Sequence, residues 1–505
     1  MTRPGFVLEI GPKSPPLLTL AGAYPRLTRF SPGTQVVYPA EATASTDPVG
    51  LIQHALAAPL ESEPLANLLQ PETKLAVVVV DEGTPLPAAR FDARRNMIEL
   101  VLETAARAGV ADVHIVTTAG LRPRWSPARV GQVLGDRVAM SFLPDELIAS
   151  HDVTAADLVS VGSVEGHEVR INAQVAAADV VVSIGLQTGP GYSDCSWLGL
   201  CDDETINACR GLGATAARRA AVQELVLAGR RHFHLQATLG QPLFTHGMNF
   251  LSRREWRWQA GSQANFATIR QLAALLPDSA QGRLVSTLAD YAVLDVAAGH
   301  PTPVLTQAQQ VWRTANAVAI QPTADVVVSS AWGQEIDAAY AIGSPIGAAH
   351  QVLVEQVTSH EAGSFGRKDC VVIGFHPLTR NDANRARVPS DDFLNTVLPE
   401  TLEPQQIKDS HEATAMHDTW YRKLYRDHGA FHPLHVFHQW YAIAQASTTI
   451  AELIWVAADR GVAEKLGHRV ASTYLDALEI AADKVGRSPQ ITYLHSPGRA
   501  VGVTP

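Results

Sequence analysis

The sequence predicts an α/β protein made of two α/β domains, whose mainly parallel sheets face an interdomain cleft. Short β-branched runs alternate with Ala/Leu-rich stretches along the 505 residues, which is the order of elements in α/β folds. The runs are nearly continuous in Val, Ile and Leu, as in parallel strands covered on both faces. The heptapeptides 178-ADVVVSI-184 and 324-ADVVVSS-330 are almost identical, and each precedes a Gly-containing loop. We interpret them as equivalent strands of two domains; coincidence between two common strand sequences is the alternative.

The individual elements follow from these runs. Strands are expected over residues 75–81, 112–120, 179–185, 325–330, 370–375, 451–457 and 491–496. Helices are expected over residues 90–108, 215–230, 334–356 and 461–485. The break at 299-GHPTP-303 predicts an N-terminal domain of residues 1–300 and a C-terminal domain of residues 301–505. The polar, Pro-containing segment 376–405 is expected to be a long excursion from the second domain, as a lid or as surface decoration.

Composition restricts the classes of partner. Hydrophobic residues make up 46% of the chain and charged residues 18%, which is enough for a sizeable core. The net charge of -10 and the lack of a Lys/Arg-rich run argue against a nucleic-acid partner. No apolar run approaches the length of a membrane span, and the N-terminal residues do not form a signal peptide. We therefore expect a cytoplasmic protein that binds a small anionic or polyhydroxylated molecule, and we leave its oligomeric state open.

Several separated motifs occur in a specific order. They are 77-VVVVDEGTPLP-87, 114-HIVTTAGLRP-123, 161-VGSVEGHEVRIN-172, 178-ADVVVSIG-185, 203-DETI-206 and 324-ADVVVSSAWG-333. In this order the chain resembles the nickel-pincer lactate racemase family, two-domain α/β isomerases of 2-hydroxy acids. The resemblance implies a nickel ion in a pincer nucleotide that is tethered to a lysine and ligated by a histidine. It also implies two further histidines that serve as acid/base groups on opposite faces of the substrate carbon.

The residues that the resemblance requires are missing here. The first acid/base histidine is replaced by Leu121, and the second falls near Pro190 or Gly191. The metal-binding histidine falls on Arg210, and the chain has no lysine between Gly185 and Arg210. We therefore expect a rebuilt site without a covalently attached pincer nucleotide, we predict no metal ligands, and we leave the actual cofactor open.

Four residues are candidates for catalysis. Asp81 and Glu82 end a buried strand, where one carboxylate could act as a base; a helix cap or turn residue is the alternative. Tyr192 and Asp194 lie among glycines in the loop after the strand at 179–185, where they could share a proton or bind a substrate hydroxyl. Polar turn residues are the alternative for this pair.

Further residues are candidates for substrate binding. The glycines of the loop 185-GLQTGPGYSDCSWLG-199 permit close backbone approach and positive φ, and Arg122 and Arg210 offer guanidinium forks for a carboxylate. Arg210 would supply a fixed positive charge where the family places its metal. Because strand ends meet at one edge of a sheet, Asp81, the loop after Gly185 and the second-domain loop are expected to line one cleft. The full set is Thr84, Arg122, Gly185, Gly189, Gly191, Arg210, Trp332 and Gln334.

Two clusters could in principle bind a metal ion. His432, His435 and His438 fall on one face of a helix, but a partly buried polar face is the more common reason for such a pattern. Cys195, Cys201 and Cys209 lack the close pairing of dedicated metal sites, which favours small buried hydrophobic residues.

The sequence therefore predicts a divergent lactate-racemase-like enzyme with isomerase or epimerase chemistry on a small hydroxy acid or sugar acid. Two alternatives stay open. The chain could be a non-catalytic homologue that binds a small molecule, or a genuine nickel-pincer racemase of 2-hydroxy acids.

Overall fold

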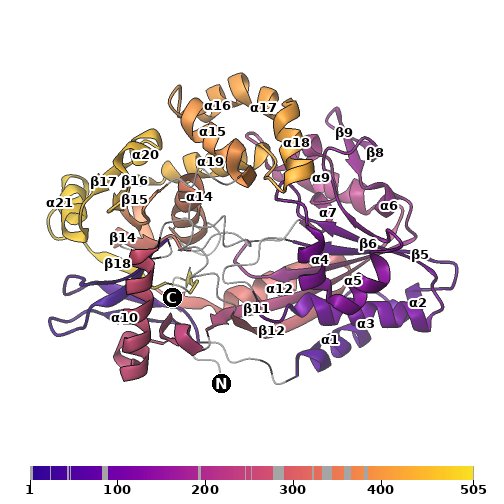
Figure 1. The fold of residues 1–505 in the computed structure, drawn as a ribbon, viewed down its shortest axis with the longest axis horizontal. Helices are drawn as coiled ribbons and strands as arrows, with labels where there is room; N and C mark the ends of the chain where they lie inside the picture. Colours follow the sequence, from indigo (N-terminus) through magenta and orange to yellow (C-terminus); the bar gives the residue numbers. More distant parts are fainter. Residues whose placement is uncertain are drawn as a thin grey trace.

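The computed structural model confirms the α/β fold class, with two mainly parallel sheets and helices on their faces (Figure 1). It describes residues 4–22, 24–41, 45, 47–81, 89–191, 195–244, 246–251, 253–276, 289–320, 324–332, 344–357, 365–379, 385–496 and 498–503. Among these residues, no helix is both long and apolar enough to cross a membrane.

The first sheet has six strands in the order β12-β11-β10-β5-β6-β7. All neighbours are parallel except β12, which is antiparallel to β11. Its core strands are buried at every position except Lys74, the first residue of β5, as the unbroken Val runs predicted. Their bounds are β5 (Lys74–Val80), β6 (Asp112–Thr118), β7 (Ile148–Ser150), β10 (Val180–Gln187), β11 (Arg231–Leu243) and β12 (Asp290–Gly299).

The second sheet has seven strands in the order β1-β4-β18-β14-β15-β16-β17. Its first two strands come from the N-terminus, and β4 is parallel to β18, so that Gln35 is paired with Thr492 (Figure 1, indigo beside yellow). The division of the chain at residue 300 stays a prediction, and the N-terminal strands β1 and β4 lie in the sheet that the C-terminal half builds. The bounds are β1 (Phe6–Glu9), β4 (Gln35–Tyr38), β14 (Ala324–Ser330), β15 (Gly366–Phe375), β16 (Ile450–Val456), β17 (Arg469–Ala471) and β18 (Ile491–Leu494).

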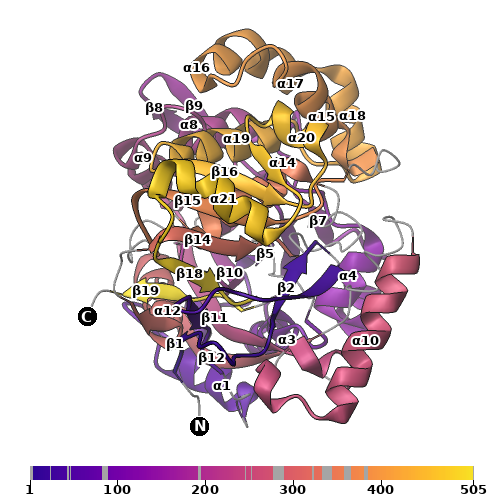
Figure 2. The ribbon, with the colours of Figure 1, turned by 90° about the vertical axis from the view of Figure 1, so that its left-hand side faces the viewer.

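Three small ribbons complete the strands. They are β2 (Leu17–Ala21) with β3 (Tyr24–Thr28), β8 (Val159–Val164) with β9 (His167–Ile171), and β13 (Ala317–Ala319) with β19 (Val501–Val503). The helix α10 (Ala260–Leu275) packs against β3, and Figure 2 shows it beside the ribbon that contains β2.

The expected helices are present in part. Residues 90–108 and 215–230 contain α3 (Ala93–Arg107) and α9 (Ala216–Leu227). Of the helix expected over 334–356, residues 334–343 lie outside the described residues, and the rest is α14 (Pro345–His350) followed by the π-helical η3 (Gln351–Val357). The single helix expected over 461–485 is wrong. The first helix, α20 (Arg460–Lys465), ends shortly before Gly467, whose φ is +73°, because a left-handed glycine ends a helix. The strand β17 then separates α20 from the second helix, α21 (Tyr474–Val485).

The remaining helices are α1 (Pro48–Ala57), α2 (Leu65–Leu68), α4 (Pro127–Leu134), α5 (Asp136–Phe142), α6 (Ala173–Ala176), α7 (Cys195–Leu198), α8 (Asp203–Arg210), α12 (Pro301–Ala315), α15 (Val388–Asp392), α16 (Pro404–Ile407), α17 (Ala413–His417), α18 (Thr419–His428) and α19 (Leu434–Ser447). The short 3-10 and π-helical segments are η1 (His246–Leu251), η2 (Glu255–Arg257), η4 (Arg385–Arg387), η5 (Phe393–Val397) and η6 (Lys408–Glu412).

The excursion after β15 is a helical bridge, which we define as residues 385–428. It crosses from the second sheet to the helices of the first (Figure 1, orange, top). Arg422 Nη2 lies 3.1 Å from Asp203 Oδ2, and the hydroxyl of Tyr425 donates to the backbone oxygen of Gly120 over 3.1 Å. The excursion therefore joins the two halves of the molecule.

A buried hydrogen-bond chain strengthens this junction. Glu412, at the end of η6, accepts from Asn207 Nδ2 on α8 over 2.8 Å and from the Tyr441 hydroxyl on α19 over 2.7 Å. The other amide atom, Asn207 Oδ1, lies 2.9 Å from His438 Nε2. We call these four residues the Glu412 latch. It satisfies polar groups from both halves in one network.

Candidate functional site

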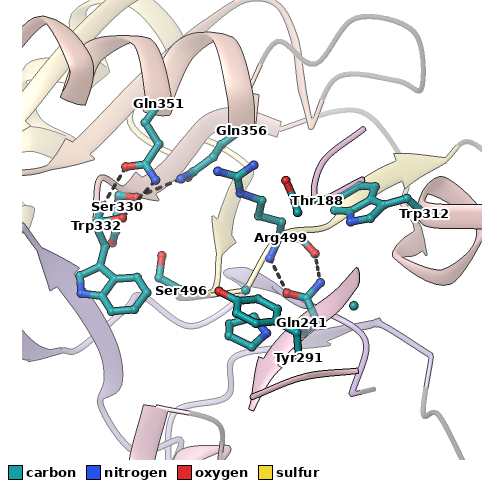
Figure 3. Close-up of a pocket in the computed structure, with 13 residues that line it drawn as sticks. Thr188, Gln241, Tyr291, Trp312, Ser330, Trp332, Gln351, Gln356, Ser496 and Arg499 are labelled. Atoms are coloured by element: carbon teal, nitrogen blue, oxygen red, sulfur yellow. Dashed lines mark hydrogen bonds between the residues drawn. The ribbon is translucent and has the colours of Figure 1, made fainter. Parts of the chain in front are cut away.

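A polar pocket lies between the two sheets, where strand ends from both converge (Figure 3). Thr188 follows β10, Tyr291 belongs to β12, and Ser330 ends β14. The cavity volume is about 30 Å³, which is room for one or two water molecules. A larger ligand therefore needs some lining side chains to move. The lining residues are Thr188, Gly240, Gln241, Pro242, Tyr291, Trp312, Ser330, Trp332, Gln351, Gln356, Ser496, Gly498 and Arg499.

The Gly-rich loop after β10 is held through its carbonyl oxygens. Gln187 Nε2 donates to the oxygens of Gly189 and Gly191 over 2.5 and 2.8 Å. Gln309 and Arg313 of α12 both donate to the oxygen of Pro190 over 3.0 Å. These contacts fix the loop against α12 and set Thr188 at the pocket wall.

The glycines of this loop do not have the expected positive φ: Gly185, Gly189 and Gly191 all lie outside the left-handed region. Packing explains two of them. A Cβ on Gly185 would lie 2.4 Å from Gln236 Oε1, and one on Gly189 would lie 3.3 Å from Arg499 Nη1. Close approach, rather than backbone conformation, therefore requires glycine at 185 and favours it at 189.

Arg499 is fixed at the centre of the pocket by its backbone (Figure 3). Gln241 Oε1 accepts from the Arg499 N–H over 3.0 Å, and Gln241 Nε2 donates to the Arg499 oxygen over 2.5 Å. The same amide nitrogen donates to Asn316 Oδ1. Gln241 belongs to β11 of the first sheet, whereas Arg499 follows β18 of the second sheet. The first sheet therefore positions Arg499.

The π-helical segment η3 forms the opposite wall. Gln351 accepts from the Trp332 N–H over 2.9 Å and donates to the Trp332 oxygen over 3.2 Å, and Gln356 Nε2 donates to the Ser330 oxygen over 3.1 Å. Two amides of one segment thus satisfy the backbone at the end of β14. Single turns of π-helix are frequent at functional sites.

The same segment carries a carboxylate toward Arg499. Glu355 Oε2 lies 2.8 Å from Arg499 Nη2, and Glu355 Oε1 lies 3.4 Å from His350 Nδ1. Burial would raise the pKa of Glu355, but the charges of Arg499, His350 and Arg122 lower it to about 2. Glu355 is therefore ionised at any physiological pH.

Arg122 brings a second guanidinium from the first sheet. It follows β6, and its Nη1 donates to the backbone oxygen of Asp81 over 3.2 Å. It is close enough to influence both Glu355 and His435 of α19. Burial, and then Arg122, hold the pKa of His435 well below its usual range, so this imidazole is neutral at pH 7. The charged side chains of Arg122, Glu355 and Arg499, together with His350 and the neutral His435, form a group that we call the cleft cluster.

Of the predicted residues, Trp332 lines the polar pocket, and Arg122 belongs to the cleft cluster. Thr188, in the predicted loop but not itself a candidate, also lines the pocket, whereas Gly185, Gly189 and Gly191 are not among its lining residues.

Asp81 is not a lining residue. Its Oδ2 accepts from Trp125 Nε1 over 2.7 Å and its Oδ1 lies 4.0 Å from Arg94 Nη1, so the carboxylate is buried among structural partners. The role of Asp81 as a base stays a prediction.

Arg210 lies elsewhere. It ends α8 and lines a large groove between α8 and α19, together with His438 and Arg219. Its role in substrate binding stays a prediction, because it is not among the residues of the polar pocket. Glu82, Thr84, Tyr192, Asp194 and Gln334 lie outside the described residues.

The two clusters considered for metal have structural partners. His432 Nε2 lies 3.3 Å from Asp203 Oδ2, and His438 is bound to Asn207. Cys201 and Cys209 are buried thiols. Within the ranges that the structure describes, no group of three or more His, Cys, Asp or Glu side chains could hold a metal ion.

The residues present do not fit a lysine-tethered nickel nucleotide. Leu121, at the position of an acid/base histidine, is buried in an apolar cluster, and its oxygen accepts from the His432 N–H over 2.9 Å. The loop after Gly185 carries no lysine, and Arg210 stands where the family has its metal-binding histidine. The resemblance thus extends to the fold, whereas the replacement of the groups that hold the family's cofactor stays a prediction.

Comparisons with known proteins agree with the fold. The family model of the lactate racemase N-terminal domain matches residues 29–189. The solved lactate racemase apoprotein from Thermoanaerobacterium thermosaccharolyticum matches with a TM-score of 0.59 and 14% identity, over 96% of this chain and 99% of that one. A protein from Thermotoga maritima matches with a TM-score of 0.46 and 10% identity, over 91% and 97% of the two chains. The search of curated proteins finds no match.

Proposed function

The chain is a lactate racemase-like protein, and on that premise we propose that it is a divergent enzyme that acts on a small hydroxy acid or sugar acid with isomerase or epimerase chemistry. The observation that carries the proposal is Arg499, which is anchored by Gln241 in the polar pocket. A guanidinium in this position suits the carboxylate of such a substrate, because its fork matches two carboxylate oxygens.

The surrounding residues suit the rest of the substrate. Thr188, Ser330 and Ser496 offer hydroxyls to the pocket. Arg122 adds positive charge from the first sheet. The neutral imidazole of His435 is a candidate acceptor for a proton from the substrate, because its low pKa leaves a free nitrogen lone pair at pH 7. We assign these roles without any step through a pincer nucleotide.

Calorimetric titration with lactate, malate and gluconate tests the binding site. We expect Arg499→Ala to weaken binding of the preferred acid roughly 10- to 100-fold, the range for a hydrogen bond to a charged group. Arg367→Ala is the matched control, since Arg367 pairs with Asp325 on the second sheet at 2.6 Å. Wild-type affinity in Arg499→Ala, with a loss in Arg210→Ala, would move the site to the groove beside α8.

Two observations separate the alternatives. An enzyme that inverts a carbon centre exchanges the hydrogen of that carbon with solvent deuterium or forms the other stereoisomer, whereas a binding protein does neither. A genuine nickel-pincer racemase would show bound nickel and a nucleotide chromophore, and a tethered cofactor would add mass to the intact chain. Neither signal is expected here, because the tether and metal-binding residues are replaced.

A further inference from the structure

A carboxylate of the protein itself, that of Glu355, pairs with Arg499, the lining arginine that is proposed to bind the substrate. Glu355 directs both oxygens at positively charged or hydrogen-donating groups, Arg499 at 2.8 Å and His350 at 3.4 Å. This is the arrangement that a bound carboxylic acid would adopt toward the same two side chains.

The local structure of η3 does not depend on the contact between Glu355 and Arg499. Gln351 and Gln356, on either side of Glu355 along the chain, are the residues of η3 that satisfy the end of β14. The side chain of Glu355 is 34% exposed, and those of Arg499 and His350 are 29% and 23% exposed. Glu355 can therefore leave Arg499 without breaking a buried network.

The pocket, with its side chains in their present positions, is also too small for a hydroxy acid. Its volume of about 30 Å³ holds only one or two water molecules, and Arg499 lies at its centre. Entry of a ligand thus requires movement of lining side chains, and Arg499 is one of them.

We propose that Glu355 occupies the carboxylate position of the ligand-free site, and that an acid binds by displacing it from Arg499. The inference rests on the proposed function, because it assumes that Arg499 binds the ligand. It makes Glu355 a determinant of specificity. A ligand must bring its own negative charge to compensate Arg499, so an uncharged analogue cannot displace Glu355. Hydroxyls that reach Thr188 or Ser330 help an acid to compete with Glu355 for Arg499.

The opposite role would have a different signature. If Glu355 only positions Arg499 for the substrate, its removal misplaces the guanidinium and weakens binding. The two roles therefore predict opposite signs for the same substitution.

The experiment measures binding of lactate and of its uncharged amide, lactamide, to wild type and Glu355→Gln by calorimetry. We expect lactate to bind at least about 10-fold more tightly to Glu355→Gln, because the competing charge is gone. Glu355→Asp, which shortens the side chain, should give a smaller gain, and lactamide should gain less than lactate. The control is Glu452→Gln, which removes the partner of Arg469 at 3.4 Å on the second sheet and should leave affinity unchanged.

A second readout is independent of affinity. Displacement takes Glu355 away from Arg499, so its pKa should rise from about 2 toward 4.5. At pH 5, wild type should therefore take up roughly a quarter of a proton more on binding than Glu355→Gln, measured in buffers of different ionisation enthalpy. Unchanged or weaker lactate binding in Glu355→Gln, with wild type binding normally, overturns the displacement alone. If neither protein binds lactate, malate or gluconate, the proposed function falls with it.

Discussion

Loss of the Glu412 latch should destabilise the protein far more than loss of a surface ion pair. Glu412 is buried and accepts hydrogen bonds from Asn207 and Tyr441. Glu412→Ala leaves both donors without this acceptor, at about 1–3 kcal/mol for each buried group. We therefore expect a loss of roughly 2–5 kcal/mol in the free energy of unfolding. Glu412→Gln should cost less, because its amide oxygen still accepts one of the two bonds.

The assay is urea unfolding followed by far-UV circular dichroism. Glu400→Ala is the control in the same bridge, since Glu400 pairs with His411 at 3.1 Å but has a 64% exposed side chain. Exposed pairs contribute about 0–1 kcal/mol. A double-mutant cycle with Asn207→Ala should show coupling of about 0.5–3 kcal/mol, because the two side chains are in contact. Equal stability of Glu412→Ala and Glu400→Ala would refute the assignment of the latch.

Gly185→Ala should lower the free energy of unfolding by about 1–3 kcal/mol, because its Cβ would lie 2.4 Å from the side-chain oxygen of the buried Gln236. Gly191→Ala is the control, since a Cβ there meets nothing within 4 Å, and this variant should melt like wild type. Equal melting temperatures would contradict this packing argument. Stability should also fall as the pH drops below 6.5, because burial lowers the pKa of several histidines to about 3 or 4 and the unfolded chain then binds protons that the native state does not. Each of these histidines lowers the free energy of unfolding by up to about 1.4 kcal/mol per pH unit. Urea midpoints that stay constant from pH 6.5 to 5 would exclude this contribution of the buried histidines. These residues are His232, His234, His376, His438 and His468.

The central strands could be predicted because local sequence specifies them. The run at β10 is buried at every position, so an unbroken apolar pattern identifies it without knowledge of its neighbours. The strands β1 and β4 are only four residues each, and their stability comes from pairing with each other and with β18. Nothing near Gln35 in the sequence indicates a partner at Thr492.

The site was predictable only in its location. Strand ends identified Trp332 and the loop after β10, because ligands bind at the carboxyl ends of parallel strands, but Thr188 was not singled out within that loop. Arg499 follows β18 of the second sheet, and Gln241 of the first sheet holds it in the pocket. No motif spacing in the sequence indicates this contact. Glu355 lies in a stretch that reads as an ordinary helix, and only the geometry of η3 distinguishes it from a surface residue.

The pairing of β4 with β18 has a consequence for synthesis of the chain. Gln35 leaves the ribosome long before Thr492 exists, and at 5–20 residues per second the interval is roughly 20–90 s. During that time the N-terminal strands have no parallel neighbour, and β4 exposes one open edge. Nascent chains should therefore be vulnerable to aggregation or chaperone capture until the C-terminal segment emerges. The first sheet, whose strands span residues 74–299, can assemble during this interval and leave the second sheet to close last.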